Sequence, residues 1–264
     1  MYAFKYQRPK SVAEAAAALS KGEDVKLLAG GQSLIAAMKL RLSAPTDLID
    51  LGGIKELTGI RVENTAITIG AMTRHAEVAQ SKDVLARIPA LASLAGEIGD
   101  RMVRNMGTLG GSLAHNDPVA DYPAAVLGLG AAVITDRREI AADDFFKGMF
   151  ETALQAGEII VSVRFPAPRR AAYVKFRNPA SRYAIVGVMV AETGGGVRVA
   201  VTGAASGVFR VAAMEQALAR SWSSDAIAAI SVPAAALNSD MHASAEYRAH
   251  LITVMARRAV DAAK

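Results

Sequence analysis

The sequence predicts an α+β protein, with short helices and strands in alternation over its first two thirds and a small unit of antiparallel strands and helices at its end. Residues 25–39 follow the order strand, glycine turn, helix, which is typical of an α/β unit. Residues 171–202 contain three runs that alternate in the manner of antiparallel strands. Pro166 and Pro168 stand between these regions and mark the best linker candidate.

Before the prolines, the sequence predicts an alternation of short helices and strands. Ser11 is expected to cap the first helix, with Glu14 completing a capping box. Asn64 and Thr65 are expected to turn a hairpin. The expected elements are a helix over 11–20, strand 25–28, helix 34–39, strand 46–51, hairpin 62–69, a helix over 84–98 interrupted near Pro89, a long ordered loop over 101–121, helix 124–129, and strands 131–135 and 158–165.

After the prolines, the pattern changes to a sheet with helices on one face. Strands are expected over 171–176, 185–191 and 197–202, with a tight hairpin at Gly194, Gly195 and Gly196. Helices are expected over 214–221 and 247–263.

The composition excludes several classes of chemistry. With no cysteine, the chain has no disulfide, no thiolate nucleophile and no cysteine-ligated iron–sulfur cluster of its own. The N-terminus lacks the pattern of a secretory signal and no apolar run is long enough to span a membrane, so a cytoplasmic protein is expected. The net charge of +5 is scattered and aromatic residues are 5% of the chain, which argues against nucleic-acid binding.

The first candidate site is Ala29, Gly30, Gly31, Gln32 and Ser33, which follow a strand and precede a helix. Adjacent glycines allow positive φ and turn backbone N–H groups towards one point, where a phosphate would bind. The Ser33 hydroxyl adds a donor. An ordinary glycine turn is the competing interpretation.

The second candidate site repeats the glycine pair, in Thr108, Leu109, Gly110, Gly111 and Ser112. Two such loops in one chain indicate that both grip one pyrophosphate. Asp121 follows, and its carboxylate suits a ribose or ribityl diol. The alternative role of Asp121 is to cap the helix that begins next to it.

No catalytic residue and no metal ligand is predicted. The chain has neither a Rossmann fingerprint, a P-loop nor a nucleophile elbow. Its four histidines are far apart in sequence, and His115 is the only one beside a candidate site.

These motifs resemble, in order and over nearly the whole chain, the FAD-binding medium subunit of carbon-monoxide-dehydrogenase and xanthine-dehydrogenase-type molybdenum hydroxylases. Gln32 stands where some relatives have histidine, and Ser112 where many have asparagine; both keep the capacity to hydrogen-bond. The matching segments are 29–34, 69–73, 103–112, Asp117 with Pro118, Asp121, 244–248 and 257–259.

The resemblance implies a vanillyl-alcohol-oxidase-type (PCMH-type) FAD-binding fold followed by a C-terminal α+β flavoprotein domain. The implied domains are residues 1–54 and 55–168, which hold FAD between them, and residues 169–264. It also implies that residues 29–33 and 108–112 hold the FAD diphosphate, that Asp121 helps to bind the cofactor, and that Lys175 and Tyr183 approach the flavin. For Tyr183 the alternative is a strand residue packed in the sheet.

The resemblance further implies an oxidoreductase subunit that passes electrons through FAD to an external acceptor. A molybdenum-binding large subunit and a small subunit with [2Fe-2S] clusters would be its partners, as a dimer of heterotrimers. A stand-alone FAD-dependent oxidase or dehydrogenase of the same fold is the main alternative. A nucleotide-sugar reductase of the same superfamily and a non-catalytic adaptor are further ones.

Overall fold

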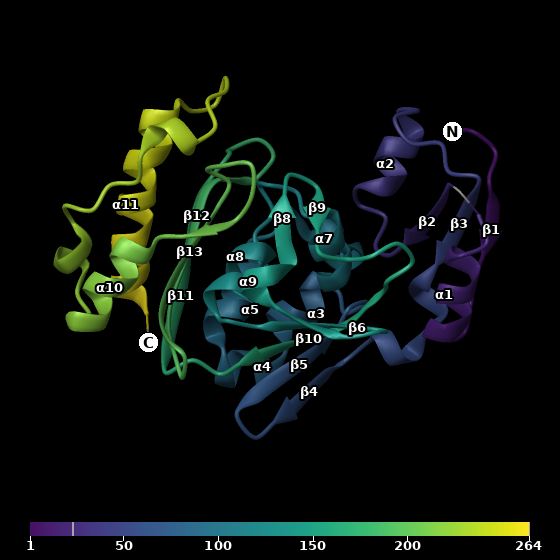
Figure 1. Ribbon diagram of the computed structural model, residues 1–264, viewed down its shortest axis with the longest axis horizontal. Coiled ribbons are helices and arrows are strands. Elements are labelled where there is room, and N and C mark those ends of the chain that lie inside the picture. The colour runs from purple at the N-terminus through teal and green to yellow at the C-terminus, as the bar shows by residue number, and fades with distance from the viewer. Residues whose placement is uncertain (23, 264) are drawn as a thin grey trace.

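The computed structural model describes residues 1–22 and 24–263, and over them the chain forms four sheets with flanking helices. In Figure 1 the N-terminal unit lies at the right end and the C-terminal helices α10 and α11 at the left. The five-stranded sheet and its helices lie between these two ends.

The N-terminal unit is a parallel sheet of three strands in the order β1-β3-β2. Parallel neighbours need crossover connections, and the two helices of the unit supply them. Its small core includes Ile159, which comes from a distant part of the sequence. The elements are β1 (Lys5–Gln7), α1 (Val12–Leu19), β2 (Val25–Leu28), α2 (Leu34–Lys39), β3 (Asp47–Asp50) and the 3₁₀ turns η1 (Leu51–Gly53) and η2 (Lys55–Leu57).

The middle unit contains an antiparallel sheet in the order β4-β5-β10-β6-β7. Its last strand in sequence, β10, lies at the centre, so the sheet is complete only when residues 160–166 are in place. The strands are β4 (Ile60–Glu63), β5 (Ala66–Gly70), β6 (Ala132–Thr135), β7 (Glu139–Ala141) and β10 (Ile160–Pro166), with a separate hairpin of β8 (Phe146–Gly148) and β9 (Glu151–Thr152). The helices are α3 (His75–Gln80), α4 (Lys82–Arg87), α5 (Pro89–Gly96), α6 (Arg101–Met106), α7 (Leu109–His115), α8 (Tyr122–Gly128) and α9 (Ala142–Phe145).

The C-terminal unit is an antiparallel sheet that is covered on both faces. Helices α10 and α11 pack on one face, and α5 and α8 of the middle unit pack on the other. Strand β12 contributes side chains to both faces. Val188 and Val190 belong to the core shared with α10 and α11, and Met189 and Ala191 belong to the core shared with α5 and α8. Alternate side chains of a strand point to opposite faces. The elements are β11 (Arg170–Arg177), β12 (Ala184–Thr193), β13 (Gly196–Thr202), β14 (Phe209–Arg210), α10 (Ala212–Arg220), η3 (Ser224–Ile227), η4 (Ala234–Ala236) and α11 (Ala245–Ala262).

The expected α+β architecture and most of the expected elements are confirmed. The hairpin at Asn64 and Thr65 and the turn before Gly196 both form. Residues 84–98 form two helices, α4 and α5, because Pro89 begins the second one. Ser11 accepts a hydrogen bond from the Glu14 amide, but the Glu14 carboxylate accepts from Lys10 and so does not complete the expected capping box.

The long ordered loop expected over 101–121 is wrong, because residues 101–106 and 109–115 are helical. Each helix has a side-chain cap: Asp100 accepts from the Val103 amide at 2.9 Å, and Thr108 accepts from the Gly111 amide at 3.2 Å. The glycine, asparagine and aspartate content suggested a loop. Here Gly110 and Gly111 stand in the first turn of a capped helix, where close packing selects them.

Candidate functional site

The two glycine loops lie against each other. A Cβ atom on Gly30 would lie 2.1 Å from the carbonyl oxygen of Met106 and 2.7 Å from Cα of Gly107. A Cβ on Gly111 would lie 3.2 Å from Cβ of Ala29. The loop after β2 therefore packs on the junction of α6 and α7 at a distance that only glycine permits at position 30.

The first loop combines a left-handed turn at Gly31 with backbone amides that have no protein acceptor. Gly31 has φ +72°, which a residue with a side chain rarely adopts. Within the described residues, the amides of 30–33 donate to no protein acceptor. Gln32 and Ser33 are exposed, and the side-chain nitrogen Nε2 of Gln32 donates to the Gly30 carbonyl oxygen at 3.4 Å. This loop can offer several adjacent N–H donors to one ligand.

The second loop differs from the first, although the two glycine pairs look alike in sequence. The Leu109 and Gly110 amides donate to the carbonyls of Thr73 and Ala71, at 3.1 and 2.8 Å. The Gly111 amide donates to Thr108. The two glycine pairs therefore differ in whether protein acceptors engage their backbone amides. Its backbone supports the contact between the loops, while the partly exposed Ser112 adds a hydroxyl beside it.

Asp121 is buried in an ion pair with the C-terminal sheet. Its carboxylate accepts from the Tyr173 hydroxyl at 2.5 Å, and Lys175 Nζ lies 3.0 Å from the same oxygen. The carboxylate makes no cap bond to helix α8, so the capping alternative is wrong. Burial raises the pKa of Asp121, and the charge of Lys175 and the bonds from Tyr173 and Lys175 oppose that rise.

Lys175 has no exposed side-chain surface in this structure. Its ammonium group donates to Asp121 and, at 3.0 Å, to the carbonyl oxygen of Glu97 at the end of α5. Tyr173, two residues earlier, reaches Asp121 over Gly187, where a Cβ would lie 2.2 Å from the tyrosine oxygen. Asp121 and Lys175 thus meet each other in the boundary between the middle and C-terminal units.

Tyr183 lies in the connection before β12, and about half of its surface is exposed (50%). The alternative of a tyrosine packed within the sheet is therefore wrong. Partial burial raises the pKa of its hydroxyl, and the charges of Asp117 and Asp121 raise it further. The ring is available to cover a ligand on the side where these carboxylates lie.

Sequence reasoning missed two residues of this region. Tyr173 is the hydrogen-bond donor to Asp121, and its position two residues before Lys175 on a strand was a signal that both share a face. His75 packs against Gly107, with Nε2 2.5 Å from the position of a Cβ there. The expectation that His115 is the only histidine beside a candidate site is therefore wrong.

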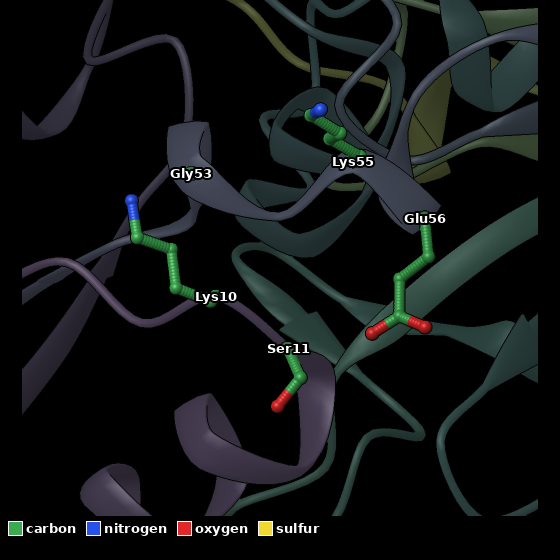
Figure 2. Close-up of a pocket in the computed structure, with 5 residues that line it drawn as sticks. All are labelled: Lys10, Ser11, Gly53, Lys55 and Glu56. Atoms are coloured by element: carbon green, nitrogen blue, oxygen red, sulfur yellow. The ribbon is translucent and has the colours of Figure 1, made fainter.

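A hollow in the surface lies at the start of α1 and is lined by Lys10, Ser11, Gly53, Lys55 and Glu56. Figure 2 shows that the polar ends of Lys10, Lys55 and Glu56 point in different directions. The Glu56 carboxylate accepts from the Val12 amide at 2.7 Å. No residue of either glycine loop lines this hollow, and its side chains do not converge on a ligand.

Family comparisons cover both the first two units and the C-terminal unit of the fold. Residues 2–168 match the FAD binding domain in molybdopterin dehydrogenase, and residues 171–263 match the CO dehydrogenase flavoprotein C-terminal domain. The chain belongs to this family of FAD-binding oxidoreductase subunits.

Its relatives include chains that are named medium chain or medium subunit. The chain is 37% identical to the carbon monoxide dehydrogenase medium chain of Hydrogenophaga pseudoflava, over 98% of this chain and 96% of the relative. It is 37% identical to the nicotine 6-hydroxylase medium subunit of Paenarthrobacter nicotinovorans, over 98% and 96%. The solved carbon monoxide dehydrogenase from Hydrogenophaga pseudoflava superposes with a TM-score of 0.87 at 38% identity, covering 99% of this chain and 97% of that one.

Proposed function

We propose that the chain binds one FAD at the contact between its two glycine loops. We further propose that it passes electrons from the iron–sulfur clusters of a partner subunit, through this FAD, to an external acceptor. The observation that carries the proposal is the row of unengaged amides at residues 30–33, next to the close contact of Gly30 with the end of α6 at Met106 and Gly107. Adjacent N–H donors that no protein group engages suit the oxygens of a diphosphate.

The residues of this chain fit that cofactor in distinct ways. Ala29, Gly30, Gly31, Gln32 and Ser33 would provide donors to the diphosphate. Thr108, Leu109, Gly110, Gly111 and Ser112 would support them, with Ser112 adding a hydroxyl. Asp121 and Lys175 would hold β11 at the site, and Tyr183 would cover the flavin. FAD supplies the redox chemistry when bound, while the chain binds and orients it and limits access of water.

We propose a division into FAD-binding subdomains at 1–54 and 55–168 and a C-terminal domain at 169–264. The N-terminal parallel sheet, the five-stranded sheet and the C-terminal sheet fall within these three ranges. The first glycine loop lies in the first range and the second loop in the second. FAD would therefore bind across a domain boundary.

We propose that the chain works with a molybdenum-binding large subunit and a small subunit that carries [2Fe-2S] clusters, as a dimer of heterotrimers in the cytoplasm. Relatives of nearly the same length are called medium chains or subunits, which favours a subunit over a stand-alone oxidase. Among the described residues, no helix is both long and apolar enough to cross a membrane. Co-expression with the two partner chains, followed by measurement of the mass of the complex, tests the assembly.

The absorption spectrum of the purified chain, with and without added FAD, tests the cofactor. We expect flavin bands, with FAD as the pigment released on denaturation. Gly31→Ala should lose most of the bound flavin, because alanine at φ +72° is strained by about 1–2 kcal/mol and turns the amides away. Gly194→Ala is the matched control, since a Cβ there meets nothing within 4 Å and its φ is ordinary.

The flavin content of the co-expressed complex distinguishes an FAD site that is weak in the isolated chain from one that does not exist. Flavin in the complex, but not in the isolated chain, would mean that the partners complete the site. If neither the chain nor the complex contains flavin, the proposed function is wrong.

A further inference from the structure

His75 is a buried histidine next to the candidate diphosphate site. It is the first residue of α3 and only 5% of its surface is exposed. Its side chain is not among the nearest neighbours of Gly30 or Gly31 in the first glycine loop. It lies instead behind the second loop, in contact with Gly107.

The backbone around His75 is joined to the second glycine loop at several points. The His75 amide donates to the Gly107 carbonyl at 3.0 Å, and Arg74 and Thr108 form an isolated β-bridge. The Leu109 amide donates to the Thr73 carbonyl at 3.1 Å. Residues 71–75 thus form a support along which the second loop is attached.

The imidazole ring of His75 completes this support. Its Nε2 and Cδ2 atoms lie 2.5 and 2.9 Å from the place where a Cβ on Gly107 would be. Gly30 also approaches Gly107, because a Cβ on Gly30 would lie 2.7 Å from Cα of Gly107. Gly107 is therefore approached closely by both the histidine ring and the first glycine loop, so a shift of Gly107 changes the contact between the loops.

The polar character of His75 is not explained by its local hydrogen bonds. Among the residues that the structure describes, His75 Nδ1 is buried without a hydrogen-bond partner, and so is the hydroxyl of Tyr122, whose ring centroid is 5.3 Å from that of His75. Burial, assisted by the charge of Arg104, lowers the pKa of His75 to about 4. The ring is therefore neutral near pH 7, and its role here is that of a flat, uncharged group packed against Gly107.

We propose that His75 is a positioning residue of the FAD site, and that its ring fixes Gly107 in the place against which Gly30 packs. This inference rests on the proposed function. It assigns the histidine a role through the loops and no contact with the cofactor. The ring thus determines where the amide donors of residues 30–33 lie relative to helix α7.

Titration of the flavin-free full chain with FAD, followed by flavin fluorescence, tests the inference. His75→Ala should weaken FAD binding by about tenfold or more, because Gly107 loses its support. His75→Phe, which keeps a flat ring, should retain affinity within about threefold of the wild type. His250→Ala is the matched control, since His250 is exposed on α11, and it should bind FAD as the wild type does.

A second pair of variants separates this role from a general loss of stability. Gly107→Ala should also weaken FAD binding, because the methyl group collides with the ring. In the double variant His75→Ala with Gly107→Ala, the methyl group occupies space that the ring has left, and affinity should recover relative to both single variants. Riboflavin, which has no diphosphate, should compete equally well for the wild type and for His75→Ala.

The outcomes distinguish the two proposals. Wild-type affinity in His75→Ala, or a double variant that is weaker than either single one, would overturn the role of His75 while leaving FAD binding intact. Equal losses in His75→Phe and His75→Ala would overturn it too, because ring shape would then not matter. A wild-type chain and complex that bind no FAD would overturn the proposed function itself.

Discussion

The hydroxyl of Tyr173 donates a 2.5 Å hydrogen bond to the carboxylate of Asp121, and so joins strand β11 to the start of helix α8. Lys175 on the same strand neutralises that carboxylate. Both donors come from the C-terminal sheet and the acceptor comes from the middle unit. The relative position of these two units therefore depends on a buried charged cluster as well as on apolar packing.

Removing the lysine charge should be strongly destabilising. Lys175→Met leaves the Asp121 carboxylate buried without its cation, and loss of one partner of a buried pair typically costs about 3–5 kcal/mol in the free energy of unfolding. The double variant Asp121→Asn with Lys175→Met should lose less, because no buried charge remains. Urea unfolding measures both, with Lys147→Met on the exposed hairpin as the control. Strictly additive losses would contradict the coupling.

Gly187 should be required for the tyrosine to reach Asp121. A methyl group at Gly187 would lie 2.2 Å from the Tyr173 oxygen, so Gly187→Ala should displace the hydroxyl and lower stability by about 1–3 kcal/mol. In a Tyr173→Phe background the same substitution should have a smaller effect, because the hydroxyl oxygen is absent. Thermal unfolding of the four proteins checks this, and equal effects in both backgrounds would refute it.

Glu158 should make stability depend on pH in the acid range. Arg138 bonds both of its carboxylate oxygens, at 2.9 and 3.0 Å, and lowers the pKa of Glu158 to about 2. A lowered carboxyl pKa stabilises the folded state above the unfolded pKa of 4.5, and this contribution is lost as the pH falls towards 2. Glu158→Gln should therefore be about 2 kcal/mol less stable than the wild type at pH 7.

Urea unfolding at pH 7, 5, 4 and 3 tests the Glu158 prediction. The difference between the two proteins should be constant above about pH 5 and shrink below it, as the unfolded wild type takes up a proton. Glu151→Gln, on the exposed hairpin, is the control. A difference that stays unchanged at pH 3 would show that the carboxylate has no lowered pKa.

The buried neutral His75 should lower the free energy of unfolding as the pH falls from 6.5 towards 4. Its folded pKa of about 4 lies below the unfolded value of 6.5, so between these values the unfolded chain binds a proton that the folded chain does not. Because of this difference in proton binding, the free energy of unfolding of the wild type should fall by up to about 3 kcal/mol as the pH drops from 7 to 4. The free energy of unfolding of His75→Phe should lack this slope. Parallel pH profiles would contradict the lowered pKa.

Local sequence patterns predicted the elements whose formation depends on periodicity. The strand, turn and helix of residues 25–39 could be predicted from the spacing of apolar and polar residues in a short window. The same holds for the alternating strands after Pro168. Residues 101–115 could not be predicted in this way, because Gly110 and Gly111 signal a loop locally but form part of a capped helix. The packing that selects glycine there comes from a segment outside the local window.

The site shows the same division. The sequence located both glycine loops, but not that only the first leaves its amides unengaged, because the partners of Leu109 and Gly110 lie on residues 71–73. It marked Asp121 and Lys175 as separate contacts of a cofactor, whereas they bond each other. It passed over His75, since contact with Gly107 depends on tertiary structure alone.

The place of Ile159 in the core of the N-terminal unit has a consequence for synthesis of the chain. Ala15, Ile49 and Leu57 cannot complete their apolar packing until Ile159 has emerged from the ribosome. The first glycine loop, carried by that unit, should therefore reach its final position only after more than half of the polypeptide has been made. Protease digestion of stalled nascent chains should show protection of residues 1–54 only when residue 159 is outside the exit tunnel.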